Sequence, residues 1–153
     1  TNAINLNTDY CYAFVDRAFC YILTEKFELA QNDLQMAEKI GKSDFERAVI
    51  DSIKATLLWK TGDLPAALSL MESLNAKRKD NVDVLTGLGL MQMQSDMHEA
   101  ARNSLNRAIE IDPHHAHAYY YRYKLFEKMQ LNDLAQLDKQ KLDGWNYHPY
   151  FEL

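Results

Sequence analysis

Three histidines lie close together in the sequence, at His114, His115 and His117. Imidazole is a common zinc ligand, but a zinc site needs three or four side chains that converge on the metal. These histidines directly follow Asp112-Pro113, and an Asp-Pro pair is typical of turns. We therefore expect polar turn residues here, and we assign no metal ligand.

The two cysteines, Cys11 and Cys20, could form a disulfide or hold a metal. Nine residues along one helix separate two side chains by roughly 13 Å, which is too far for a disulfide. The spacing is also not that of a CxxC motif. We expect reduced, buried or partly buried thiols, as in an intracellular protein.

No sequence motif for catalysis is present. The chain has no Gly-rich phosphate loop, nucleophile elbow or HExxH, and its carboxylates are scattered at spacings typical of solvated helix surfaces. The formal net charge is −5, and the longest basic run is Lys77–Lys79, which argues against nucleic-acid binding. We expect no enzyme activity, no catalytic residue and no cofactor.

The location of the protein is predicted from what the sequence lacks. No apolar run approaches the ~18 residues that span a bilayer, and no signal peptide opens the chain. We therefore expect a cytoplasmic protein without membrane insertion. The chain opens at Thr1 rather than Met, which is compatible with Met removal or with a piece of a longer array.

The sequence repeats itself with a period close to 34 residues, which indicates repeated secondary-structure elements. Three series of mostly small residues show the period: Ala18, Ala55 and Gly89; Ala30, Ala67, Ala101 and Ala135; and Ala3, Ala37, Leu74 and Ala108. Each series has one step of 37 residues among steps of 34, which predicts a three-residue insertion near Ser43–Arg47. Helix formers dominate and turn residues are few, with 5 Gly and 3 Pro. This pattern indicates a helical repeat array.

Small residues at fixed offsets of this period resemble the tetratricopeptide repeat (TPR). Leu85-x-x-Leu88-Gly89 opens one unit, and Asp112-Pro113 ends it. A second unit has matching residues at the same offsets, namely Phe14, Ala18, Tyr21, Ala30, Leu34 and Ala37. The segment Lys60–Ala67 is similar to the family's turn between its two helices. The sequence departs from the family at Gln92, where an aromatic residue is usual, and at Tyr123, where a small residue is usual.

The resemblance implies an all-α fold, a right-handed superhelical array of about four helix-turn-helix hairpins with terminal cap segments. Paired helices pack closest where one carries Ala or Gly, and stacking buries the apolar face of each hairpin. The expected parts are residues 1–10 (end of a preceding repeat helix or a cap), 11–47 (with the insertion), 48–81, 82–115, 116–144 and an aromatic tail at 145–153. Because Ala3–Phe14 resembles Ala108–Tyr121, we predict a helix end, a turn and a helix start in both.

TPR proteins present a concave groove lined by the first helix of each unit, and the resemblance implies such a groove here. The candidate peptide-binding residues are Tyr12, Val15, Phe19, Ile22, Leu23, Val49, Ile53, Trp59, Leu90, Met93, Tyr120, Tyr121 and Lys124. This lining suits an amphipathic helix or an extended hydrophobic peptide. The basic clamp of the chaperone-binding subclass is absent. An alternative stays open, in which Phe19, Ile22, Leu23 and Trp59 are core residues.

The predicted function is a protein–protein interaction scaffold that binds a peptide or helix of a partner in an apolar and aromatic groove. The alternatives are a self-assembly module, forming a homo-oligomer through its terminal repeats or tail, and a regulatory domain of a larger protein. The tail holds four aromatic residues after Gly144: Trp145, Tyr147, Tyr150 and Phe151. We expect it either to cap Leu134, Leu137 and Leu142 of the last repeat or to lie in the groove of a neighbouring molecule.

Overall fold

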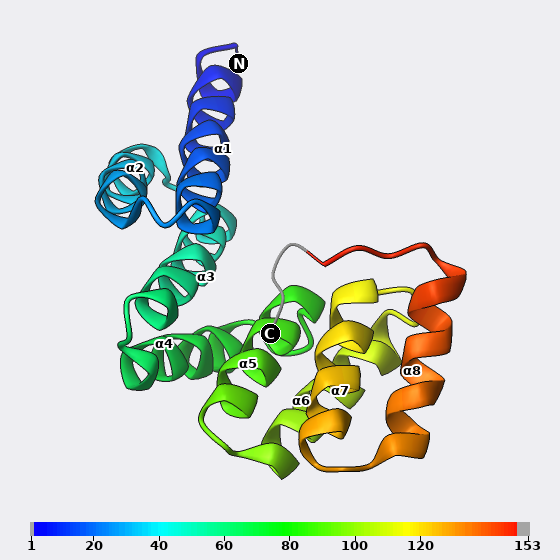
Figure 1. The fold of residues 1–153 in the computed structure, drawn as a ribbon. Coiled ribbons are helices and arrows are strands. Elements are labelled where there is room, and N and C mark those ends of the chain that lie inside the picture. The colour runs from blue at the N-terminus through cyan, green and yellow to red at the C-terminus, as the bar shows by residue number, and fades with distance from the viewer. Residues whose placement is uncertain (1, 150–153) are drawn as a thin grey trace. The chain divides into compact units, whose positions relative to one another are not determined.

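The computed structural model describes residues 2–149, with side chains described from Tyr10 onward. This part of the chain contains α-helices and no strand, which confirms the predicted all-α repeat array (Figure 1). The helices are α1 (Asn2–Leu23), α2 (Phe27–Ile40), α3 (Asp44–Lys60), α4 (Leu64–Lys77), α5 (Val82–Gln94), α6 (His98–Ile111), α7 (Ala116–Lys128) and α8 (Asn132–Gly144).

The same backbone turn recurs after the first helix of each pair. Its central residue has a left-handed φ, and these residues are Glu25, Gly62, Asp96 and Gln130, spaced 37, 34 and 34 residues apart. In each turn the next residue donates its N–H to the carbonyl five residues earlier, as Lys26 does to Tyr21 at 2.8 Å. This is the Schellman arrangement that commonly ends helices. The turns therefore have the same period as the small residues in the sequence.

The three-residue insertion lengthens α3 at its start. The Ser43 side chain accepts a hydrogen bond from the Glu46 N–H, and the Glu46 carboxylate accepts one from the Ser43 N–H. This capping box fixes the start of a helix. With this cap α3 begins at Asp44. Helix α5 begins at Val82, and the equivalent residue one 34-residue period earlier is 48, so α3 starts four residues before that position. The insertion is thus absorbed as an extra first turn of α3.

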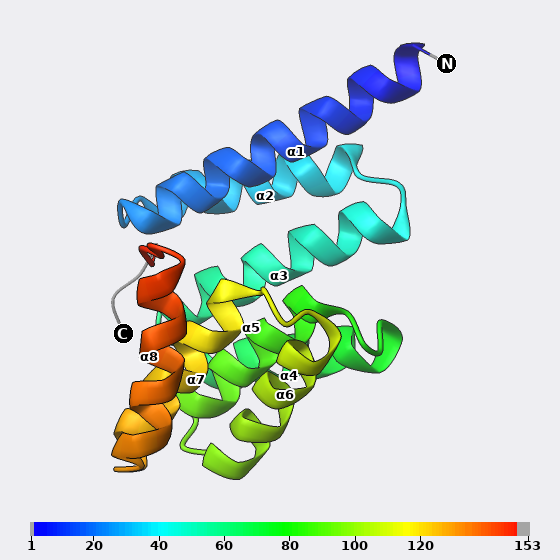
Figure 2. The same cartoon turned by 90° about the vertical axis from the view of Figure 1, so that its right-hand side faces the viewer.

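The chain divides into two compact units, Thr1–Leu70 and Met71–Leu153, with the boundary inside α4. In the first unit α1 and α2 lie side by side, and α3 packs against both (Figure 2). Their contact surface is an apolar cluster built around fully buried small residues. It contains Cys11, Val15, Ala18, Ile22, Ala30, Leu34, Ala37 and Ile50.

In the second unit α5 packs against α6, and α7 packs against α5, α6 and α8. Gly89 lies where α5 and α6 approach most closely. A Cβ atom at Gly89 would lie 2.6 Å from Cγ of Leu105, well inside van der Waals contact. Ala101 and Ala108 on α6 are completely buried. The small residues of the repeat thus mark close helix packing, as the sequence predicted.

One expectation about the first helix was wrong. The predicted turn within Ala3–Phe14 is absent, because α1 runs without interruption from Asn2 to Leu23. The corresponding later stretch does break, since α6 ends at Ile111 and α7 starts at Ala116. The difference follows from one residue: Pro113 cannot donate a helix hydrogen bond, whereas Thr8 at the equivalent position can.

In both the first and the last hairpin, an arginine–aspartate ion pair joins the two helices of that hairpin. Arg17 of α1 forms a bidentate pair with Asp33 of α2 at 2.6 and 2.7 Å. Arg122 of α7 pairs in the same way with Asp138 of α8 at 2.8 and 2.7 Å. In each hairpin the guanidinium lies near two aromatic rings of its own helix, Phe14 and Tyr21 or Tyr119 and Phe126.

The two ion pairs differ in what lies beside the arginine. Arg122 donates a third hydrogen bond to Asn106 of the preceding helix α6, at 2.8 Å, and its side chain is 19% exposed. The Arg17 side chain is 56% exposed. Removing the aspartate would therefore leave a less solvated charge in the last hairpin than in the first.

Candidate functional site

The first unit presents part of the predicted lining on α1. Tyr12, Phe19 and Leu23 are half-buried, and their spacings of seven and four residues put them along one face of the helix. Val15 and Ile22 are 3% and 2% exposed and belong to the core of the unit. The half-buried face can therefore contact a ligand through Tyr12, Phe19 and Leu23. Val15 and Ile22 instead pack inside the core cluster of the unit.

Helix α3 adds a second row of candidate residues to this unit. Val49 and Ile53 are half-buried and pack against the apolar cluster. Trp59 is half-buried, and the Nζ atom of Lys60 lies 4.3 Å from the centre of its indole ring. A cation over an aromatic face is attracted by the ring electrons. This half of the lining offers aliphatic and aromatic surface with a basic group beside it.

Phe45 also belongs to this surface, although it was not among the predicted lining residues. Phe45 is 53% exposed, and its ring meets that of Tyr12 edge-on, with 6.5 Å between the ring centres. It lies in the extra first turn of α3. The signal in the sequence was a large aromatic residue placed between the capping residues Ser43 and Glu46.

In the second unit most of the predicted lining is buried. Leu90 and Met93 on α5 are 4% and 3% exposed. Tyr120 and Tyr121 on α7 are also buried, and burial raises the pKa of Tyr121 to about 12. Only Lys124 is half-buried, with its Nζ 3.1 Å from Oε2 of Glu127. A core position therefore fits Leu90, Met93 and Tyr121 better than direct ligand contact, whereas the burial of Tyr120 includes a contact with the tail.

The tail accounts for part of the burial on α7. The described tail residues turn back across the start of α7 (Figure 1). The Trp145 ring meets Tyr119 edge-on at 5.2 Å, and the Tyr147 ring lies 5.3 Å from His117 and 5.9 Å from Tyr120, measured between ring centres.

Trp145 and Tyr147 do not form the expected cap over the apolar residues of the last repeat. Leu142 is buried, but Leu134 and Leu137 are 42% and 58% exposed. Tyr150 and Phe151, the other two tail aromatics, lie outside the described residues.

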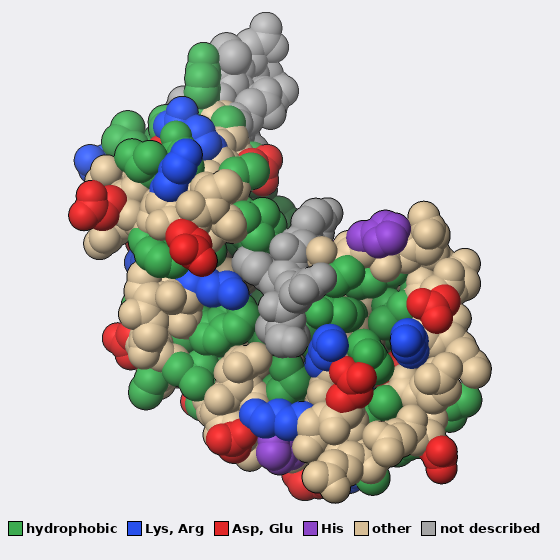
Figure 3. Space-filling view, in the orientation of Figure 1, with side chains coloured by type: hydrophobic (Ala, Val, Ile, Leu, Met, Phe, Trp, Pro, Cys, Tyr) green, Lys and Arg blue, Asp and Glu red, His purple; other side chains and the backbone are tan. Residues whose placement is uncertain are grey.

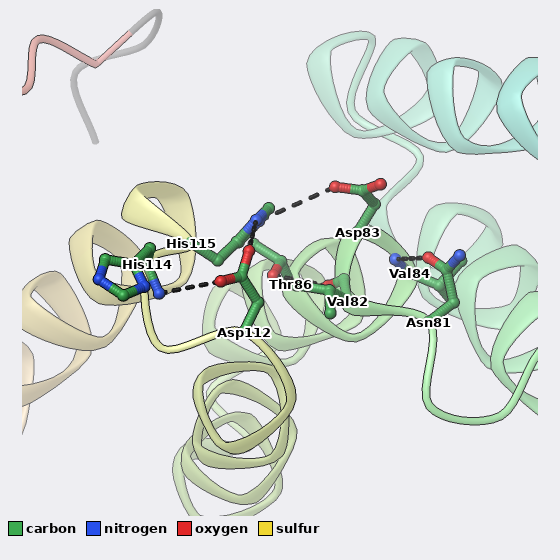
Figure 4. A network of polar contacts seen from close by, with 8 residues as sticks. All are labelled: Asn81, Val82, Asp83, Val84, Thr86, Asp112, His114 and His115. Carbon is green, nitrogen blue, oxygen red and sulfur yellow. Dashed lines mark hydrogen bonds and ion pairs between the residues drawn. The ribbon is translucent and has the colours of Figure 1, made fainter.

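The histidine cluster forms a polar network rather than a converging ligand set (Figure 4). His115 lies between two carboxylates, 3.9 Å from Asp83 and 3.9 Å from Asp112. The backbone N–H of His114 donates to Asp112 at 2.9 Å. Among the described residues, no three His, Cys, Asp or Glu side chains are placed to hold a metal ion. The network instead secures the turn that starts α7.

His117 lies on the first turn of α7 and faces the tail. Burial lowers the pKa of its imidazole, the nearby His115 lowers that pKa further, and Asp83 opposes both. The neutral imidazole is therefore the form that suits its contact with the Tyr147 ring.

The exposed surface is mixed in character. Figure 3 shows hydrophobic side chains gathered in patches, with acidic and basic side chains distributed around them. No helix in the described part of the chain has the length and apolar character needed to cross a membrane. Both cysteines are free, with Cys11 buried and Cys20 exposed.

Several solved structures share this fold at low sequence identity. YrrB, described as a TPR protein with an unusual peptide-binding site, is 18% identical with a TM-score of 0.62, covering 92% of this chain and 72% of YrrB. A tetratricopeptide repeat protein from Parabacteroides merdae is 18% identical with a TM-score of 0.63, covering 93% of this chain and 56% of that one. MamA MSR-1 C2 is 20% identical with a TM-score of 0.59, covering 84% and 72%.

Among curated proteins, the bovine (Bos taurus) BBSome complex member BBS4 is 29% identical over 94 residues. The match covers 61% of this chain but only 17% of that relative. A family model described as tetratricopeptide repeat matches residues 58–122, from the end of α3 to the middle of α7. Residues 58–122 thus match the tetratricopeptide repeat model, and the hairpin turn recurs with the same period before, within and after that segment.

Proposed function

We propose that the chain is a non-catalytic scaffold that binds an apolar peptide or amphipathic helix of a partner protein on the α1–α3 surface of its first unit. The observation that carries the proposal is the row of half-buried or exposed apolar side chains on two packed helices. Its members are Tyr12, Phe19, Leu23, Phe45, Val49, Ile53 and Trp59. Large aromatic residues of this kind dominate binding energies at protein interfaces.

The chemistry of the surface favours an apolar ligand. Apolar and aromatic side chains spaced along a helix match the anchors of an amphipathic helix or an extended hydrophobic segment. Burying about 400 Å² of apolar ligand surface gives roughly 10 kcal/mol at about 25 cal/mol/Å². Association costs remove a large part of this, so we expect an affinity in the micromolar range.

Two comparisons agree with a role in protein association. The TPR family is typically a non-catalytic scaffold, and the name of the bovine relative places that protein in a complex. YrrB is described as having a peptide-binding site. Neither relative identifies the ligand of this chain.

The experiment is selection of peptides from a random displayed library, followed by affinity measurement with the parent and three variants. Phe19→Ser and Trp59→Ala should each weaken binding of a selected peptide about tenfold or more, since each removes one central aromatic contact. Leu137→Ser is the matched control, because Leu137 is also an exposed apolar helix residue but lies on α8. If no peptide is selected, or if all three variants bind like the parent, the proposal is wrong.

A further inference from the structure

The last helix ends in a way that fixes the direction of the tail. Asn146 has a left-handed φ of 53°, and the N–H of Tyr147 donates to the Leu142 carbonyl at 3.1 Å. The N–H of Asn146 donates to Asp143 at 3.1 Å, which completes a Schellman motif. Gly144 is the last residue of α8. Because this cap sets the path of the backbone, Trp145 and Tyr147 are both held near α7.

The tail makes edge-on and tilted aromatic contacts with three residues of α7 and with one residue of the turn before it. Trp145 meets Tyr119 and also lies 6.1 Å from His114, and Tyr147 meets His117 and Tyr120. Aromatic pairs with ring centres 4.5–7 Å apart stabilise a contact beyond the area that they bury. A short segment therefore binds this surface through two aromatic residues two positions apart.

The tail does not fill the site that it covers. A cavity of about 390 Å³ remains between the tail and α7, lined by His114, Ala116, His117, Trp145, Asn146, Tyr147 and His148. Trp145 itself stays 38% exposed. An incompletely filled contact held by two aromatic anchors can be exchanged for a better-fitting segment of the same chemistry.

We infer that the start of α7 is a second peptide-binding surface, specific for an extended segment with two aromatic residues at positions i and i+2. In this structure the chain's own residues 145–149 occupy it, so a partner segment of that pattern must displace the tail. This inference rests on the proposed scaffold function, but it concerns a different helix and a different ligand pattern.

The test uses the full chain and a labelled peptide with the sequence of Gly144–Pro149. The tail is undocked by the double variant Trp145→Ser/Tyr147→Ser, and Leu134→Ser/Leu137→Ser serves as the matched control on exposed apolar residues of α8. A tail joined directly to the helix that positions it has an effective concentration of about a millimolar or more, so for a peptide of about 100 µM affinity it should weaken binding to the parent about tenfold or more. The undocked variant should therefore bind the peptide about tenfold or more tightly than the parent and the control.

Two altered peptides test the required pattern. A peptide with Ser in place of both aromatics should not bind, and one with an extra Ser between the aromatics should bind several-fold more weakly. The inference is overturned if the undocked variant does not bind, if it binds no better than the parent, or if the altered peptides bind equally well.

A second measurement tests the inference without the Trp145→Ser/Tyr147→Ser variant, in case that variant does not fold. In the full chain carrying Trp59→Phe, Trp145 is the single tryptophan, so acrylamide quenching reports directly on the docked tail. A tail peptide with Phe at its Trp position should increase the quenching of Trp145 as it displaces the tail. Unchanged quenching at saturating peptide contradicts the inference. Failure of either measurement leaves the Phe19 and Trp59 binding test on α1–α3 unaffected, so the two proposals can fail separately.

Discussion

Replacing Asp138 by Ala should strongly destabilise the second unit. The Asp138 side chain is 4% exposed and accepts two hydrogen bonds from Arg122, at 2.7 and 2.8 Å. The substitution leaves the Arg122 guanidinium 19% exposed and without its counter-charge, with only Asn106 still bonded to it. Removing one partner of a buried ion pair typically costs about 3–5 kcal/mol, and the partial exposure of Arg122 places our expectation near 3 kcal/mol.

The first hairpin supplies a matched control for this prediction. Asp33→Ala removes the same bidentate contact, but Arg17 is 56% exposed and water can solvate the released guanidinium. Exposed ion pairs contribute little to stability. We therefore expect a clearly smaller loss in the first unit than Asp138→Ala causes in the second.

The assay is urea unfolding followed by tryptophan fluorescence, with one tryptophan in each unit. Trp145 reports on the second unit in a Trp59→Phe background, and Trp59 reports on the first in a Trp145→Phe background. The change in the free energy of unfolding is obtained from the midpoint and slope of each transition. Equal losses for the two aspartate variants, or a loss below about 1 kcal/mol for Asp138→Ala, would refute the burial argument.

Three further predictions test the repeat turn, the close helix contact and the histidine at the tail. Gln130→Gly should stabilise the second unit by about 0.5–1 kcal/mol, measured as a higher urea midpoint, because glycine adopts the left-handed φ of 59° without strain; an unchanged or lower midpoint contradicts this. Gly89→Ala should destabilise the same unit by about 1–3 kcal/mol through contact with Leu105, whereas Gly144→Ala, with no atom within 4 Å of the added Cβ, should change the melting temperature little; similar melting temperatures would contradict the packing. Burial holds the folded-state pKa of His117 below the ordinary histidine value of 6.5, so its contribution to stability is complete above that pH and is lost as the pH falls below it. His117→Gln should therefore reduce the loss of stability between pH 7 and pH 5.5 in thermal melts, and an identical pH dependence in parent and variant would exclude this role.

Much of the fold could be predicted because close helix packing leaves a mark in the sequence. Ala18, Ala55 and Gly89 recur at the repeat period, and each is buried where two helices meet. The sequence also predicts an insertion near Ser43–Arg47, the stretch in which α3 starts earlier than the repeat period places it. Its outcome, an extra helical turn, follows from the capping box that Ser43 and Glu46 form.

The lining of the groove was harder to predict because its residues and the core residues are equally apolar. The first helix of each repeat contacts other helices on several sides. Residues at adjacent positions of that helix can therefore differ in burial, one lying in the core and the next on the surface. On α1 the periodicity grouped Val15 with Phe19, yet the structure buries the first and leaves the second half-exposed. On α7 the tail itself covers Tyr120, and no local pattern in the sequence reports such a contact.

The paired charges were not predicted, although they recur at the repeat period. Arg17 and Arg122 are 105 residues apart, as are Asp33 and Asp138, which is the sum of the three repeat steps. The signal was present in the sequence, but only the structure shows that each arginine meets the aspartate sixteen residues later.

The central claim, that the α1–α3 surface binds a peptide, is tested most directly by site-specific photo-crosslinking. A photoreactive phenylalanine is placed at position 19 in one sample and at position 137 in another, and each is irradiated with a labelled peptide selected from the library. Phe19 lies in the proposed surface, whereas Leu137 is 58% exposed on α8. We predict a crosslinked product at position 19 that unlabelled peptide competes away, and none at position 137. Equal crosslinking at both positions, or crosslinking at position 137 alone, would contradict the account.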